Sequence, residues 1–408
     1  MKRLFICVLS LVVLISFAVI PAMAVEKKLV KISRCGWLEG EVPLDRLIAV
    51  YNTLPEREQD GVQIFLDPAG KGETDPLLKT LRADKEMPWN GYTCSPAFIQ
   101  METAIMMGNI QPIEKYFATT QYKEAAARIK SDMFTSVWNE SSYKGQLYYM
   151  PLVVDVVVYM YRSDYYAAVG YADTPKTWDQ VLDVSKKVQV KYAKDKVFGF
   201  GVSTAGTWRY LAAMHQAFAP PENLFTSEGL MNITDPGWIK AMEVSKTFID
   251  AKVVPLGWET SGGYGDEWKK GKLAAQVMQH SHGPWGGMIW GYDKLKIVPI
   301  VPGAGIKKAG TMFWSSSFVL YNECPYPQET MDFIIWLSDP NNADFQASLF
   351  KAGKISPFKS AYVNYINKDD VSQNWTLGVR DLLEAATAAP NNRWYIVTHG
   401  FVYPQFVA

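Results

Sequence analysis

A run of β-branched and aromatic residues from Leu152 to Tyr161 constrains the fold of this chain more than any other feature of its sequence. The run carries one charge, Asp155. Such a run predicts a strand buried on both faces, as found in parallel sheets covered by helices. A lone carboxylate inside such a strand is costly unless it finds a hydrogen-bonding partner. Asp155 is therefore either paired within the structure or directed into a cleft, where it binds ligand hydroxyl groups.

Strand and helix patterns alternate along the chain, which predicts an α/β fold with helices on the faces of a mostly parallel sheet. Thr177 and Gln180 have the spacing of a capping box at the start of one helix. The predicted strands are 29–33, 61–66, 152–161 and 199–202. The predicted helices are 44–51, 76–82, 178–190, 207–218, 236–250 and 328–337.

The N-terminus has the layout of a secretory signal peptide over residues 1–24. Lys2 and Arg3 precede an apolar run that ends at Pro21, and an Ala-x-Ala cleavage site follows. An uncleaved anchor helix is the alternative, because the run is close to membrane-spanning length. Cys7 lies inside the run and not at the cleavage site, so no lipid attachment is expected. We predict a soluble periplasmic protein that starts at Val25.

The 384 residues that remain after cleavage suggest two domains or one large domain. They carry 39 basic and 41 acidic residues, which leaves no electrostatic basis for binding a nucleic-acid backbone. Three cysteines remain, Cys35, Cys94 and Cys324, in no metal or redox spacing. One disulfide or none is equally compatible with the sequence.

No motif of a nucleotide-binding, hydrolase or metalloprotease site is present, and no cofactor is predicted. His280 and His282 would lie on one side of a strand, but a metal site there lacks a third ligand nearby. A pair of carboxylates of the glycosidase type is not identifiable from spacing, because the required separation is spatial. An enzyme is therefore not the favoured prediction.

Aromatic residues gather beside Gly, Ser and Pro in segments that read as loops or strand ends. Aromatic rings suit the C–H faces of a sugar, while carboxylates and amides take its hydroxyls. A core role is the alternative for any one of them. The group consists of Trp37, Trp208, Trp258, Tyr264, Trp285 and Trp314.

Four segments, in order, resemble the extracellular solute-binding proteins of ABC importers, especially the sugar-binding group that includes maltose-binding protein. Arg162 departs from the pattern where the family usually has Asn, and His282 departs just before Gly-Pro-Trp. The segments are Tyr143–Pro151, Tyr159–Asp179, Trp268–Trp285 and Val298 to the helix at 328–337.

The resemblance implies two α/β lobes of the type II periplasmic-binding-protein fold with a ligand cleft between them. The lobes would comprise 25–152 plus 300–348 and 153–299 plus 349–408. By position, Asp155 matches an acidic hinge-strand residue that binds sugar hydroxyls, and Trp285 matches the aromatic on which a sugar ring stacks. The full set of predicted ligand-binding residues is Trp37, Glu39, Asp155, Tyr161, Trp208, Trp258, Tyr264, His282, Trp285 and Trp314.

The implied function is capture of a sugar, oligosaccharide or polyol by hinge closure, and delivery of this solute to an ABC permease by a monomeric protein. His282 leaves a charged ligand open, so an organic acid or polyamine is the alternative solute. A secreted carbohydrate-active enzyme that uses Asp155 in an acid/base pair is the alternative from another class.

Overall fold

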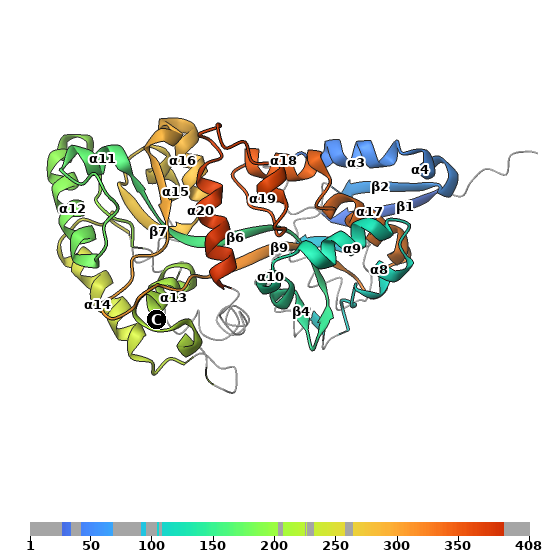
Figure 1. Cartoon of the computed structure of the whole chain (residues 1–408), viewed down its shortest axis with the longest axis horizontal. Helices are drawn as coiled ribbons and strands as arrows, with labels where there is room; N and C mark the ends of the chain where they lie inside the picture. The colour runs from blue at the N-terminus through green and yellow to red at the C-terminus, as the bar shows by residue number, and fades with distance from the viewer. Residues whose placement is uncertain are drawn as a thin grey trace, which may run out of the picture.

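The computed structural model describes residues 27–33, 42–67, 91–94, 104–105, 108–202, 207–224, 226, 232–257 and 264–386. Two lobes lie side by side, and strands β6 (Tyr149–Arg162) and β9 (Phe313–Leu320) run between them (Figure 1). The predicted signal peptide and the predicted helix 76–82 lie outside the described residues. No described helix is both long and apolar enough to cross a membrane.

The first lobe is built on strands β2, β1, β3, β9 and the first half of β6, in that order. Strands β1, β2 and β3 are parallel to one another, and β9 runs antiparallel to both β3 and β6. All but β9 therefore run the same way. Its elements are β1 (Lys28–Ser33), α3 (Leu44–Asn52), α4 (Pro55–Asp60), β2 (Val62–Asp67), β3 (Gly91–Cys94), α8 (Lys115–Thr119), α9 (Lys123–Asp132), α10 (Thr135–Glu140), β4 (Ser142–Tyr143), β5 (Gln146–Leu147), α17 (Pro327–Ser338), α18 (Ala343–Lys351) and α19 (Ala361–Asn364).

The second lobe surrounds the second half of β6, which pairs antiparallel with β7 on one edge and β8 on the other. Two parallel bridges, Phe198 to Leu273 and Gly201 to Gln276, replace the predicted strand 199–202. Here β6 runs antiparallel to both β7 and β8, and only the two bridges are parallel, so the sheet of this lobe is mixed. The elements are α11 (Ser163–Ala168), α12 (Trp178–Lys191), η2 (Ala193–Asp195), α13 (Thr207–Phe218), η3 (Pro221–Leu224), α14 (Pro236–Asp250), α15 (Gly265–Lys269), β7 (Ala275–Gln279), α16 (His282–Trp290), η4 (Tyr292–Lys294), β8 (Leu295–Val298) and α20 (Trp375–Ala386).

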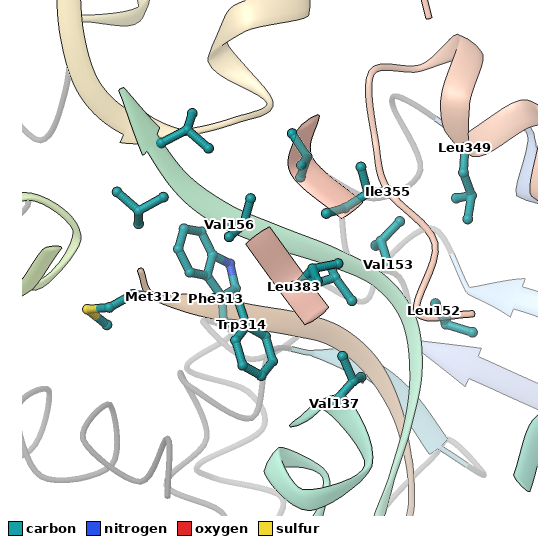
Figure 2. Close-up of a cluster of buried hydrophobic side chains, with 14 of the residues drawn as sticks. Val137, Leu152, Val153, Val156, Met312, Phe313, Trp314, Leu349, Ile355 and Leu383 are labelled. Carbon is teal, nitrogen blue, oxygen red and sulfur yellow. The ribbon is translucent and has the colours of Figure 1, made fainter. Parts of the chain in front are cut away.

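Strand β6 changes its partner between Val156 and Val157. Val156 is paired with Phe313 of β9, whereas Val157 is paired with Gln279 of β7. All fourteen residues of the strand are buried, in agreement with the prediction from its apolar run. A buried cluster around this point joins the lobes, with Val137 of α10, Val156 of β6 and Leu383 of α20 among its members (Figure 2). This part of β6 is the hinge strand of the two-lobed fold.

The chain after residue 348 contacts both lobes. The Phe134 amide donates to the Pro357 carbonyl, and the Ser360 hydroxyl donates to Asp132 at the end of α9. Helix α20 instead packs against β8 and β6 in the second lobe. Residues 357–360 are thus attached to the first lobe, and the chain returns to the second lobe before α20.

Helix α12 shows the predicted cap in a modified form. Thr177 Oγ1 accepts a hydrogen bond from the Gln180 amide at 3.2 Å. The Gln180 side chain accepts from the amide of Lys176, one residue before the N-cap, instead of closing the box on Thr177 itself. Both bonds satisfy amide groups that have no partner within the helix.

Candidate functional site

Asp155 lies on the hinge strand directly beside the point where β6 changes partner. The residue is 3% exposed. It is paired across the sheet with Trp314 of β9, so the two side chains stand on the same face. Lys354 Nζ is 3.9 Å from Asp155 Oδ2 and is itself 2% exposed. The ammonium group offsets part of the cost of burying the carboxylate.

His280 occupies the turn after β7 and lies against Asp155. Its Nδ1 accepts a hydrogen bond from the Val156 amide at 3.1 Å, which places the proton of the neutral ring on Nε2. Nδ1 is also 3.4 Å from Asp155 Oδ1. Burial lowers the pKa of His280 to about 4, although the Asp155 charge acts in the opposite direction. The imidazole is therefore neutral at pH 7, and Lys354 supplies the positive charge beside Asp155.

Helix α16 presents Trp285, the partly exposed aromatic of the site. The His282 ring stacks on Trp285 with centroids 4.8 Å apart and planes at 29°. Two ammonium groups lie over the indole, Lys269 Nζ at 4.8 Å and Lys354 Nζ at 5.8 Å from the ring centroid. Lys354 thus contacts both Trp285 in the second lobe and Asp155 on the hinge strand.

The predictions that Trp285 lies in a loop or at a strand end and that His282 lies on a strand were wrong. His282 begins α16, and Pro284 lies in its first turn, where the missing amide proton carries no penalty. A Cβ on Gly286 would lie 2.5 Å from Trp268 Nε1, and one on Gly287 would lie 2.7 Å from the Tyr292 ring. The glycines therefore serve close packing of α16, and not loop formation.

Trp375 also lies at this site, beside His280, and was not predicted from the sequence. Its ring stacks on His280 with centroids 5.3 Å apart and planes at 28°. Its Nε1 donates to the Ser372 carbonyl at 2.9 Å, which fixes the indole at the start of α20. The signal available in the sequence was the Asn-Trp pair that opens the last amphipathic segment, but no motif tied this segment to the cleft. Lys354, in the Gly-Lys-Ile-Ser stretch after α18, was missed for the same reason.

The structure brings Asp155, His282, Trp285 and Trp314 into one neighbourhood and places Tyr161 away from it. Trp314 is 3% exposed and belongs to the buried cluster of Figure 2. Tyr161 is six residues along β6 from Asp155, or about 20 Å at ~3.3 Å per residue, and stacks on Tyr166 with centroids 4.5 Å apart. Tyr264 is buried and donates its hydroxyl to the Val202 carbonyl.

The other predicted site residues fall outside what the structure describes. Trp37, Glu39 and Trp258 lie outside the described residues, and Trp208 lies in α13 with its side chain outside the description. The described residues hold no group of three or more His, Cys, Asp or Glu side chains arranged for a metal ion. Cys324 is buried with its Sγ 3.8 Å from Thr330 Oγ1, and the side chains of Cys35 and Cys94 are not described.

Arg162, where the sequence departs from the family pattern, has a packing role. Its guanidinium lies between the rings of Tyr165 and Trp290, at 4.0 and 4.6 Å from their centroids. It also donates two hydrogen bonds to the carboxylate of Asp164. The planar group fills this space in the second lobe in a way that an Asn side chain is too short to match.

A family model described as bacterial extracellular solute-binding protein matches residues 95–379. The chain belongs to this family. Solved structures of similar fold include the sugar-binding protein MalE of Xanthomonas citri, with 18% identity, 93% of this chain and 94% of that chain covered, and a TM-score of 0.68. An ABC substrate-binding protein of Listeria monocytogenes in complex with cycloalternan shares 15% identity, with 94% and 93% covered and a TM-score of 0.68. A solute-binding protein of Agrobacterium radiobacter in complex with ribitol shares 17% identity, with 94% and 96% covered and a TM-score of 0.67. The solute-binding family and the two-lobed fold confirm the resemblance on which the sequence prediction was based.

Proposed function

We propose that this protein binds a sugar, oligosaccharide or polyol between its lobes and delivers it to the permease of an ABC importer. One observation carries the proposal: a carboxylate, Asp155, lies where the hinge strand passes between the lobes, and Lys354 lies near both this carboxylate and Trp285 of the second lobe. A carboxylate accepts hydrogen bonds from sugar hydroxyls, and an indole covers the C–H face of the ring. The saccharide and polyol ligands named for the structural neighbours support the same class of solute.

The proposed mechanism is closure of the lobes around β6 and β9. Contacts to the solute from both lobes stabilise the closed form, which the permease distinguishes from the open one. We expect the moving bodies to follow the predicted division, 25–152 plus 300–348 and 153–299 plus 349–408, except for the segment that holds the end of α18 and α19. Residues 357–360 would move with the first lobe because of their bonds to Asp132 and Phe134. The signal peptide would place the monomeric protein in the periplasm.

Calorimetric titration with saccharides and polyols, in parallel with thermal unfolding, tests this function. A bound solute raises the melting temperature in a saturable way, because it stabilises only the folded state. Asp155→Asn is expected to weaken binding by about tenfold or more, since it removes a charged acceptor. Asp179→Asn, a change to an exposed carboxylate on α12, is the matched control and should leave binding unchanged.

The same variants separate a binding protein from a secreted glycosidase. The purified protein is incubated with aryl glycosides and with the saccharides of the titration. Turnover that disappears in Asp155→Asn and persists in Asp179→Asn would replace the binding function with an enzymatic one. Binding without turnover supports the proposal.

A further inference from the structure

Two lysines lie over Trp285 and differ in their described charge partners. Lys269 reaches the indole from α15, and Lys354 reaches it from the segment after α18. Lys354 is close to the carboxylate of Asp155. Within the described part of the chain, no carboxylate lies within ion-pairing distance of Lys269. Lys269 is therefore the lysine at Trp285 that has no described carboxylate partner, and His280 beside Asp155 is neutral.

The two lysines differ in what holds them. Lys354 is almost completely buried, and Gly353 lies so close to Pro284 that a Cβ would approach its ring within 2.6 Å. This packing fixes the backbone next to Lys354. Lys269 is only partly buried at the end of α15. The site thus has one buried and one partly exposed lysine beside the same indole.

We propose that the solute is an anionic saccharide, whose ring stacks on Trp285 and whose negative group binds Lys269. This inference rests on the proposed function and narrows its class of solute. Hydrogen bonds between an ammonium and a carboxylate or phosphate are shorter and about twice as strong as those to a neutral hydroxyl. The Lys269 ammonium consequently favours an acidic sugar over its neutral counterpart. A uronate and a sugar phosphate share this chemistry.

Matched ligands measure the preference directly. The purified secreted protein is titrated calorimetrically with glucose, glucuronate and glucose 6-phosphate, with the same three forms of galactose, and with galactobiose against digalacturonate. We expect the best anionic ligand to bind at least about tenfold more tightly than its neutral partner. The uronate and phosphate arms distinguish the two sources of charge. The preference should fall as the salt concentration is raised from ~0.02 to ~0.5 M, because salt screens the charge of the partly exposed Lys269.

Two lysine variants separate a specific role from net charge. Lys269→Gln is expected to remove most of the preference for the anionic ligand and to change the affinity for the neutral one by less than about twofold. Lys270→Gln, at the next residue and exposed, removes the same charge from the same helix end and should leave both affinities unchanged. The inference would be overturned if neutral ligands bound as tightly as anionic ones, or if the preference survived Lys269→Gln. Either result would leave the proposed function standing. Binding of no saccharide at all would overturn both.

Discussion

The amide nitrogen of Val156 lies 3.1 Å from Nδ1 of His280, so an imidazole covers the outer edge of β6 where the strand leaves β9. The edge of β9 is covered in a comparable way. The Ser315 amide donates to Glu140 Oε1 at 3.1 Å. Two titratable side chains therefore satisfy outward-pointing amides of the hinge strands, one on each strand. Their pKa shifts have opposite consequences for stability.

His280 should make the protein less stable in acid. Its pKa is lowered to about 4 from 6.5 because it is buried, so between these pH values the unfolded chain binds a proton that the folded one does not. The free energy of unfolding then falls as pH falls through this window, by about 3 kcal/mol for this group. We expect His280→Asn, which keeps an acceptor for Val156, to reduce this loss. Urea denaturation at several pH values from 7 down to 4 measures the difference, and equal pH dependence in both proteins would refute it.

Glu140 should act in the opposite direction. Burial raises the pKa of its carboxyl from 4.5 to about 7, so the folded state holds the proton more tightly than the unfolded chain. Stability attributable to this group is complete below pH 4.5 and is lost as pH rises through 7. Glu140→Gln keeps the shape and an acceptor for the Ser315 amide. It should therefore raise the free energy of unfolding at pH 8 by about 1–3 kcal/mol and have little effect at pH 4.5. A stabilisation of the same size at both pH values would contradict this cause.

The hinge strand was predictable from the sequence because its apolar run is long and continuous. Few residue types are compatible with a strand that is buried on both faces, so the single carboxylate within it was easy to recognise. Helices 207–218 and 236–250 were also predicted at their observed bounds, since their apolar residues recur at helical spacing.

The surroundings of Asp155 were less predictable, because they come from four separate segments. Lys354 and Trp375 stand far from β6 in the chain, and no local pattern records that their segments meet it. At α16 the glycines led to the prediction of a loop or strand end instead of a helix. In that helix the close approach of Trp268 and Tyr292 explains them, and this approach is a tertiary property.

Trp375 should contribute to solute affinity through its place beside His280. Trp178 offers a matched comparison in the second lobe, because it is similarly buried and its Nε1 also donates to a backbone carbonyl at 2.9 Å. Each Trp→Phe change should destabilise the fold by about 1 kcal/mol through the lost hydrogen bond. Only Trp375→Phe should also weaken binding of the best saccharide, by about threefold to tenfold. Titration of both variants, with melting temperatures measured alongside, tests the difference. Equal affinities would assign Trp375 to the fold alone.

Gly286 should be intolerant of even a methyl group. A Cβ there would lie 2.5 Å from Trp268 Nε1 and 2.6 Å from Trp290 Cζ2, in a space closed by two indoles packed edge to face. Gly286→Ala gains up to about 1 kcal/mol of helix propensity, but overpacking of this kind costs about 1–3 kcal/mol. We therefore expect a lower melting temperature, and a weaker affinity because α16 carries Trp285. Gly265→Ala is the control, since its Cβ would meet nothing closer than His282 Cε1 at 3.8 Å. If Gly286→Ala melts at or above the temperature of Gly265→Ala, the close packing of α16 against α15 is not the reason for this glycine.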